Sequence, residues 1–484
     1  MKLDKLLKTA YNAEVKAPHD YEEVVESVVP KKTHHYFFRT LKLAGVVSFS
    51  LVGAFVLTIV GAFLIAGTSI DERPQSIKKA RFSVYDTNLI MSETFKRKNA
   101  INYTAERENK FINPEFKQAV SQFACNSFAD IDKNKNYAYS PLMLYTQLDL
   151  ISCAASDEET KLQFDNALQS EDAELRRIGI STAMRNNFFA DDERKSTVQA
   201  KNAVFLESKY GANDKFVDDM TERNAEVYEM DFQNPADVNK AVEWANMSVN
   251  EPGFLKANDL NIQYDSAMLF LSSLYFDNCW SRKFMVEDTK PDNFYAYDGR
   301  IVQKDFMNHV AYLGFTDQKT YVSVTDEYAN GYSIQYFVPK KIEDNIFDLL
   351  PEDFLFKADN HDRKSVSLYL PKMSLTCESD LSDMAKNLGV TNPYEERSNH
   401  LKDAFSENAF IEYSYLNYTK QKTSVSFDED GTVVKTLTIT LGAAGTDSYH
   451  GNGYEIKLNQ PFVYCIRDPN GLPLVLGSVV DPQA

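Results

Sequence analysis

The clearest alternation of hydrophobic and polar positions lies near the C-terminus, in VVKTLTITL at residues 433–441. An acidic stretch with one glycine, DEDG, precedes it, and a run of small and polar residues follows it as far as Gly453. Successive side chains of a strand point to opposite faces. One face of this strand would carry Thr432, Val434, Thr436, Thr438 and Thr440, and the other Val433, Lys435, Leu437, Ile439 and Leu441. The pattern predicts a good strand attached to a flexible tip.

The longest uncharged stretch runs from Leu43 to Ile70. It has 28 residues, whereas a helix needs about 20 to cross the hydrocarbon core of a bilayer. The stretch is longer than the apolar part of a secretory signal peptide, and 42 residues precede it. It therefore predicts a single transmembrane helix, because no comparable run occurs later in the chain.

This helix divides the chain into a tail (1–42), the membrane span (43–70), a stalk or linker (71–113) and a folded domain (114–484). The linker shows weak periodicity, with some local helix expected near Glu93–Asn99. Four Lys or Arg residues flank each end of the span, so the positive-inside rule does not decide its orientation. A cytoplasmic tail with an exported C-terminal part is the simpler arrangement.

Helical periodicity begins after Asn113. An Asn-Pro start predicts a helix from Pro114, with apolar residues at Phe116, Ala119, Val120, Phe123 and Phe128. Pro141 is expected to begin a second helix, and polar helical stretches follow over about 157–190.

Strand-like runs dominate the rest of the domain. They are NAVFLE, AMLFLSSLYFDN, YVSVTDEYANGYSIQYFVP, SVSLYLPKMSLTCE, VVKTLTITL and PFVYCIRDPNGLPLVLGSVV. The last contains RDPNGLP between two apolar runs, which predicts a hairpin. Because helices cluster early and strands late, the pattern indicates an α+β domain without internal repeats.

Composition excludes some classes of function. The formal net charge is −18, which argues against a nucleic-acid binder, since such a protein needs a basic face to neutralise phosphates. Hydrophobic residues make up 43% of the chain, enough for a substantial core. The five scattered cysteines have no C-x-x-C spacing, so neither a zinc site, a redox pair nor a disulfide framework is expected.

No pattern typical of an enzyme is present in the sequence. It contains no G-x-S-x-G, no H-E-x-x-H and no phosphate-binding glycine loop. We expect His309, His361, His400 and His450 to be solvated surface residues, because their sequence neighbours are polar. The chain is therefore interpreted as a protein that is not an enzyme.

Five segments, in order and at the expected spacing, resemble the serpins, a family of suicide protease inhibitors. They are 140–168, 202–246 (ending after Trp244), 269–307 (with Thr289), 365–394 and 461–482. Together they extend the resemblance over essentially all of the domain. It implies an α+β fold of three β-sheets and eight or nine helices, with no cofactor and no metal ion.

The resemblance also assigns a role to residues 428–453, as the reactive-centre loop. A target serine protease attacks the tip and forms an acyl-enzyme. The cut loop then inserts into the main sheet as a new central strand, an established case of strand addition. The hinge of the loop would comprise Glu429, Gly431, Thr432, Val433 and Val434.

The alternation is compatible with insertion. The register that the resemblance implies turns the threonine face into the protein, and Thr432 would be the first side chain to pass from solvent into the sheet. A slip by one residue would instead bury Lys435, at a cost of several kcal/mol unless it were paired.

Two departures from the family pattern leave more than one function open. Val433, Val434, Lys435, Thr436 and Leu437 stand where inhibitory members carry small residues, and bulky side chains slow insertion until the acyl-enzyme hydrolyses. Ser272 stands where the family usually has Asn, near the opening of the main sheet. The chain is either an inhibitor or a non-inhibitory binding or structural surface protein. For the stretch 428–453 itself, an ordinary hairpin with a loop is the alternative to a reactive-centre loop.

Counting from the hinge places the scissile region at Ala444, Gly445 and Thr446, whereas counting back from Pro461 places it near His450. We favour the hinge count, because the length of the inserting strand constrains the mechanism. Small side chains there favour elastase-like or subtilisin-like targets.

Serpins act mostly outside the cytoplasm, which favours a single-pass plasma-membrane protein with a cytoplasmic N-terminus and an extracellular serpin-like domain. Such an anchor suggests a cell-surface inhibitor that protects the envelope of its own cell, and a bacterial cell would fit this arrangement.

Overall fold

A computed structural model describes residues 89, 91–103, 108, 110–191, 196–356, 362–433 and 453–483. All of them belong to one compact unit, Arg73–Ala484. Eight α-helices lie within these described ranges. They are α6 (Pro114–Phe128), α7 (Pro141–Ser152), α8 (Glu158–Ala167), α9 (Ala173–Asn186), α10 (Asp214–Glu222), α11 (Pro235–Ser248), α12 (Ile346–Leu349) and α13 (Ser382–Asn387).

The main sheet has eight strands, in the order β1-β5-β4-β6-β14-β13-β12, with β3 paired to β4 outside this path. Their bounds are β1 (Lys96–Arg97), β3 (Phe188–Asp191), β4 (Ser196–Glu207), β5 (Ala225–Met230), β6 (Met268–Cys279), β12 (Met373–Asp380), β13 (Lys420–Phe427) and β14 (Gly431–Val433). Only β4 and β5 pair in parallel among neighbours on this path.

The second sheet has nine strands, in the order β15-β11-β8-β9-β10-β16-β17-β2, with β7 paired to β8. They are β2 (Tyr137–Tyr139), β7 (Lys290–Tyr295), β8 (Ile301–Asp317), β9 (Tyr321–Glu327), β10 (Ser333–Pro339), β11 (Asp362–Pro371), β15 (Tyr454–Lys457), β16 (Phe462–Arg467) and β17 (Pro473–Val479). Three sheets were expected, but the described strands form two hydrogen-bonded sheets. The reason is β8, whose 17 residues pair with β7 and β11 over most of its length and with β9 at its end.

Local sequence signals explain the helix starts. The Asn113 side chain accepts a hydrogen bond from the Glu115 amide just before Pro114, and Ser140 does the same for the Met143 amide. Both satisfy amides that have no partner inside the helix. The predicted starts of α6 and α7, and the hairpin between β16 and β17, are confirmed.

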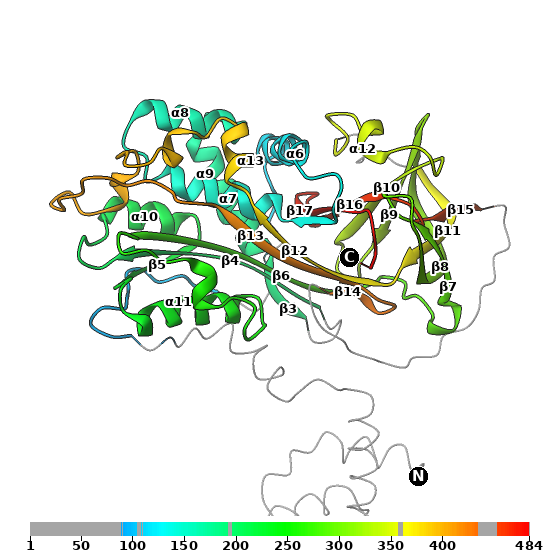
Figure 1. Cartoon of the computed structure of the whole chain (residues 1–484), viewed down its shortest axis with the longest axis horizontal. Helices are drawn as coiled ribbons and strands as arrows, with labels where there is room; N and C mark the ends of the chain where they lie inside the picture. The colour runs from blue at the N-terminus through cyan, green and yellow to red at the C-terminus, as the bar shows by residue number, and fades with distance from the viewer. Residues whose placement is uncertain are drawn as a thin grey trace, which may run out of the picture. The chain divides into compact units, whose positions relative to one another are not determined.

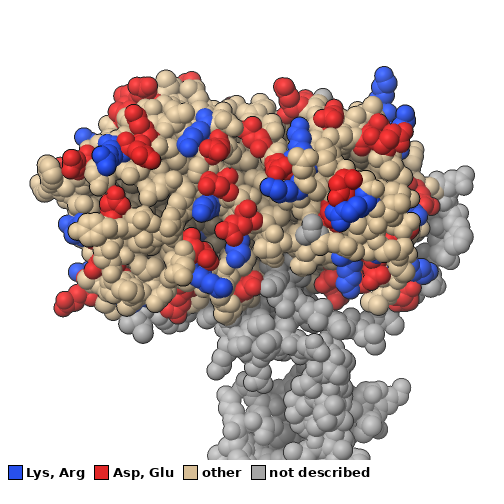
Figure 2. Space-filling view, viewed as in Figure 1, with Lys and Arg blue, Asp and Glu red and all other residues tan. Residues whose placement is uncertain are grey.

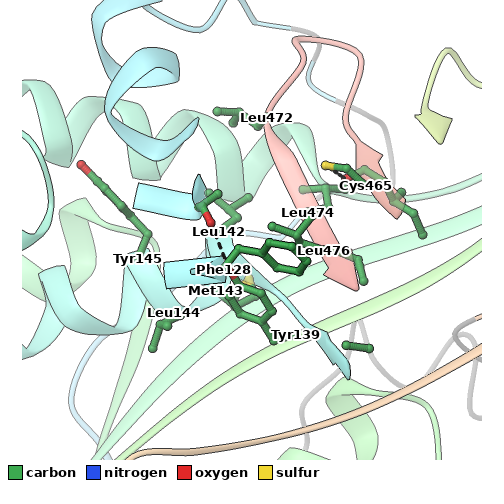
Figure 3. Packing of buried hydrophobic residues seen from close by; sticks show 14 of the residues in the cluster. Phe128, Tyr139, Leu142, Met143, Leu144, Tyr145, Cys465, Leu472, Leu474 and Leu476 are labelled. Carbon is green, nitrogen blue, oxygen red and sulfur yellow. Dashed lines mark hydrogen bonds between the residues drawn. The ribbon is translucent and has the colours of Figure 1, made fainter. Parts of the chain in front are cut away.

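The largest hydrophobic core lies between the two sheets and the helices α6 and α7. Figure 3 shows part of it, with Phe128 of α6 and Leu142 of α7 beside Leu474 and Leu476 of β17. All four side chains are buried. This packing fixes α6 and α7 against β17 of the second sheet.

The main sheet is covered on both faces (Figure 1). Helices α7 and α9 lie on one side of β4 and β6, and α11 lies on the other. A second core fills the α11 side, where Trp244 of α11 packs with Phe205 of β4 and Tyr228 of β5. In the part of the sheet where residues of α7 and α11 lie on opposite sides of β6, an added strand would be covered on both faces.

Residues 91–103 were expected to belong to a stalk, but they pack along the edge of the main sheet. Strand β1 pairs antiparallel with β5, and the Asn99 side chain bonds the backbone of Ala225 and Val227. Phe95 is fully buried in the second core. The local helix expected near Glu93–Asn99 is wrong, because tertiary contacts extend this segment along the edge of β5.

Within the described part of the chain, no helix is long and apolar enough to cross a membrane. The predicted transmembrane helix, residues 43–70, lies outside the described residues. Figure 2 shows acidic and basic side chains interspersed over the visible face of the domain. That face offers no continuous basic stripe of the kind that follows a nucleic-acid backbone.

Replacing Phe95 with alanine tests whether residues 91–103 are part of the fold. The ring lies 5.3 Å from the ring of Tyr228 between centroids, and its loss would leave a cavity in the second core. We expect the free energy of unfolding to fall by about 3–5 kcal/mol in chemical denaturation. Phe111→Ala is the control, since Phe111 is 79% exposed and should change stability by less than about 0.5 kcal/mol. Equal stability of the Phe95 variant and wild type would contradict the packing.

Candidate functional site

The candidate site lies where β14 enters the main sheet. Three residues of β14 pair antiparallel with β6 on one side, from Gly431 opposite Cys279 to Val433 opposite Asp277. On the other side Thr432 lies opposite Phe427 of β13. A Cβ atom on Gly431 would lie 2.2 Å from the Asn278 carbonyl oxygen. Glycine is therefore required for the backbone to approach β6 this closely.

A tight turn leads into β14. The Asp428 carboxylate accepts hydrogen bonds from the amides of Asp430 and Gly431, each at 3.0 Å. Trp280 holds the same turn from outside, because its indole nitrogen donates to the Asp428 carbonyl and its amide donates to the Asp430 carbonyl. Burial raises the pKa of Asp428, although these amides oppose the shift. The turn is thus fixed at both ends.

Glu429 ties this turn to two other elements. Its carboxylate accepts a hydrogen bond from Lys372 Nζ at 2.7 Å and another from Thr289 Oγ1 at 3.0 Å. Burial alone would raise the pKa of Glu429, but the bonds from Lys372 and Thr289 outweigh it and lower the pKa below its usual value. Thr289, noted in the sequence only as part of a family pattern, thus contacts the predicted hinge directly.

Thr432 lies inside the sheet, fully buried, and its hydroxyl accepts a hydrogen bond from Tyr328 Oη at 2.5 Å. The Tyr328 ring stacks on Trp280 with centroids 4.8 Å apart. The expectation that Thr432 must still pass from solvent into the sheet is therefore wrong. Two backbone ladders and a buried hydroxyl partner hold it in place, so the strand has already begun at this position.

Beyond β14, the described strands leave a space between β6 and β13. Within the described residues, β6 and β13 are joined through β14 and not by direct pairing. Two hollows follow the space between them. One, of about 170 Å³, is lined by Leu271–Leu274 and Lys420–Ser424. The other, of about 200 Å³, is lined by Met268–Leu271, Tyr418 and Lys420–Lys422. We call these two hollows together the β6–β13 groove.

The two sides of the groove differ in character. Phe270, Phe276 and Val425 belong to the main core, so alternate residues of β6 and β13 face α7. Leu269 and Leu271 contact the second core on the α11 side. The groove is therefore apolar on its α7 side and partly covered on its α11 side.

Ser272, which replaces the usual Asn, lines this groove. Its hydroxyl is buried and has no hydrogen-bond partner among the described residues. Its pairing partner on β4, Asn202, is fully buried, and the described atoms likewise offer its side-chain oxygen no partner. Gln421 on the opposite wall accepts a hydrogen bond from the Ser140 amide at 2.6 Å. Buried polar atoms without partners are costly, so the middle of the groove is poised to accept hydrogen bonds.

Sequence reasoning missed one buried polar pair near the hinge. His309, expected on the surface, is 6% exposed and lies 3.2 Å from the Asp326 carboxylate. Its ring stacks on Phe284 with centroids 4.1 Å apart, and the Phe284 amide donates to the Glu429 carbonyl. The local sequence around His309 is polar, and only the tertiary fold brings Phe284 and Asp326 to it.

The other predicted site residues have different outcomes. Glu429, Gly431 and Thr432 lie together at the head of the groove, and Val433 continues β14. Val434, Ala444, Gly445 and Thr446 lie outside the described residues, as does the alternative position His450. Their roles remain predictions. Among the described side chains, no cluster of His, Cys, Asp or Glu could hold a metal ion.

Comparison with known proteins agrees with this architecture. A family model described as "Serpin (serine protease inhibitor)" matches residues 118–482. Alpha-1-antiproteinase S of Cavia porcellus is 23% identical over 75% of this chain and 90% of its own. The native structure of tengpin, a thermophilic serpin, has a TM-score of 0.67 at 21% identity and covers 79% of this chain and 97% of its own. Human thyroxine-binding globulin has a TM-score of 0.63 at 19% identity over 76% and 98%.

The Glu429 contacts predict a pH dependence of stability. The folded pKa of Glu429 is lowered, so its stabilising contribution is present above the ordinary glutamate pKa of about 4.3 and is lost as pH falls through the folded pKa. Glu429→Gln should lower the free energy of unfolding at neutral pH and lose less on acidification than wild type. The free energy of unfolding is measured by urea denaturation at neutral pH and at a pH below the ordinary glutamate pKa. Glu455→Gln, at an exposed surface pair, should follow wild type. A Glu429 variant with the wild-type pH profile would contradict the assignment.

Proposed function

The chain belongs to the serpin family, and we propose that it inhibits serine-type endopeptidases by cleavage of the 434–452 loop, trapping of the acyl-enzyme and insertion of the loop as a strand. The observation that carries this proposal is the open main sheet with β14 at its head. We infer that a strand which begins between β6 and β13, at the head of the β6–β13 groove, could continue along the groove if it had a free end. Cleavage of the loop would supply that end.

The register of β14 predicts where each loop residue would go. Each step forward from Val433 is one step back along both β6 and β13. Val434 would then lie opposite Phe276 and Val425, and Thr436 opposite Leu274 and Thr423. Phe276 and Val425 face the main core, so Val434, Thr436, Thr438 and Thr440 would point to the α7 side. This continues the face on which Thr432 is already buried.

Insertion would be driven by burial and by backbone hydrogen bonds. An added strand would complete a ladder on each side, and each new backbone hydrogen bond contributes about 1 kcal/mol net. The hydroxyl groups of Thr436 and Thr438 would enter the part of the groove lined by Ser272 and Gln421. Threonine suits the α7 side of the groove because it has both a methyl group and a hydroxyl.

The covalent chemistry belongs to the target protease. Its serine oxygen attacks the carbonyl carbon before the scissile bond, and the peptide C–N bond breaks as the protease donates a proton to the leaving amine. An ester then joins the loop to the protease. Normally water cleaves this ester. Inhibition requires that the strand enters first and carries the esterified protease away with its active site distorted.

We further propose a site of action at the cell surface. The uncharged run of residues 43–70 would anchor the protein by a single pass, with residues 1–42 in the cytoplasm and the domain outside. The hinge count still favours a scissile region at Ala444, Gly445 and Thr446. Small side chains there suit the shallow primary pockets of elastase-like or subtilisin-like enzymes.

A second function has a specific observation in its favour. The loop carries Val434, Lys435 and Leu437 where insertion would favour small residues, and slow insertion lets water release the protease. Human thyroxine-binding globulin, similar in fold, has a name that describes binding rather than inhibition. The alternative is a non-inhibitory serpin fold that serves as a binding or structural surface protein.

Mixing the protein with elastase-like and subtilisin-like proteases separates these functions. The inhibitor proposal predicts a complex that survives SDS and contains one protease joined to the cleaved chain. It also predicts a higher melting temperature for the cleaved protein than for the intact protein, because the inserted strand is buried on both faces. Clean cleavage with no complex would favour the binding function, and an unchanged melting temperature would contradict insertion itself.

Thr436→Arg tests the inserting face. This position would face the core beside Leu274 and Thr423, where a guanidinium without a partner costs several kcal/mol. The variant should be cleaved at the wild-type rate, but it should release the protease and show little rise in melting temperature. Stoichiometry of inhibition is the measurement. Thr376→Arg is the matched control, because Thr376 is exposed on the edge strand β12 of the same sheet. A Thr436 variant that traps protease as well as wild type would exclude this register.

A further inference from the structure

Residues 95–99 lie as an extended segment along the outer edge of β5 in the main sheet. Every second side chain of the segment turns toward the domain. Phe95 is fully buried, and Arg97 and Asn99 are half-buried. The two lysines between them are exposed. This alternation is typical of a peptide that adds to the edge of a sheet as a strand.

The backbone of β5 is paired along this edge. The two residues of β1 form a ladder with two residues of β5, and the Lys98 amide donates to the Val227 carbonyl at 2.8 Å. The Asn99 side chain then replaces the backbone, because its oxygen accepts from the Val227 amide and its nitrogen donates to the Ala225 carbonyl, each at 2.9 Å. An unpaired strand edge is a template for another chain, and here the segment itself fills that template.

Two of the inward side chains have receptors made by neighbouring elements. The Phe95 ring packs against the rings of Phe205 and Tyr228, with centroid distances of 6.3 and 5.3 Å. The Asn99 amide nitrogen also donates to Thr221 Oγ1 of α10 at 2.9 Å. The edge of β5 therefore has an apolar receptor at one end of the segment and a polar receptor at the other.

A buried carboxylate receives the third inward side chain, Arg97. Glu226 is fully buried, and its carboxylate accepts a hydrogen bond from Trp244 Nε1 at 2.7 Å. Lys201 Nζ lies 3.7 Å from this carboxylate, and the Arg97 guanidinium lies 3.4 Å from it. Burial alone would raise the pKa of Glu226, but Lys201 and Arg97 outweigh burial and lower the pKa. The middle of the edge thus presents a negative charge that an arginine of an added strand can meet.

We propose that the outer edge of β5 is a peptide-binding site that recognises an extended protein segment with Phe, Arg and Asn at alternate positions. Residues 95–99 are the occupant that this chain supplies to its own site. In strand addition the main-chain hydrogen bonds give affinity, and the receptors for alternate side chains give specificity. Only two residues of the occupant form a ladder with β5, so the segment can lift and be exchanged for another of the same pattern.

The test opens the site in the full chain with Phe95→Ala, Arg97→Ala and Asn99→Ala together, and adds a fluorescent synthetic peptide of residues 91–103. Anisotropy should show saturable binding to this variant, and saturating peptide should raise its melting temperature by several degrees, because a ligand of the folded state stabilises it. Wild type should bind the peptide at least about tenfold more weakly, since its own segment occupies the site at a high effective concentration.

Two altered peptides are the matched controls. A peptide with alanine at the three inward positions should bind the open variant at least about tenfold more weakly, because alternate side chains give such sites their specificity. A peptide with alanine in place of Glu93 and Lys96, both exposed in the structure, should bind as the unaltered peptide does.

Absence of saturable binding to the open variant would overturn the proposal. Equal affinity for wild type and variant, or for all three peptides, would also overturn it, because the peptide would then bind elsewhere or without regard to its side chains. If the triple variant does not fold, Arg97→Ala with Asn99→Ala takes its place and decides by the same outcomes, because Phe95 then stays in the core. No protease takes part, so the result is independent of the proposed inhibition.

Discussion

The pairing of β14 with β6 and β13 is the interaction on which the rest of the site depends. Three residues of β14 stand between β6 and β13, and the β6–β13 groove lies beyond them. Gly431 permits the close approach to Asn278, and the Thr432 hydroxyl finds Tyr328. Within the described residues, β14 is therefore a short strand that is paired on both sides and lies at the head of the β6–β13 groove.

The contacts of Trp280 connect β14 and the turn before it to the remainder of the domain. The indole binds the turn before β14, stacks on Tyr328 and packs edge-on against Phe284. Phe284 in turn stacks on His309, which pairs with Asp326 in the second sheet. Through this series the two sheets share one buried cluster at the head of the groove. Residues of both sheets thus surround the turn that leads into β14.

Sequence patterns predicted the features that depend on neighbouring residues. The starts of α6 and α7 follow from Asn-Pro and Ser-Pro pairs, and the β16–β17 hairpin follows from its turn residues. Features that depend on distant contacts were missed. The early burial of Thr432 needs Tyr328, the position of His309 needs Phe284, and β1 is too short to show a pattern of its own. The hinge residues Glu429 and Gly431 were identified through family resemblance, but their partners Lys372 and Asn278 required the fold.

Hydrogen exchange at residues 434–441, before and after cleavage of the loop tip, tests the central claim most directly. An inserted strand has its amide hydrogens bonded to β6 and β13 on both sides, so exchange must wait for the sheet to open. The account predicts that cleavage protects these amides strongly, to the level of neighbouring β6 residues such as Leu274. Amides that exchange as fast after cleavage as before would contradict it, because the groove would then have no strand to receive.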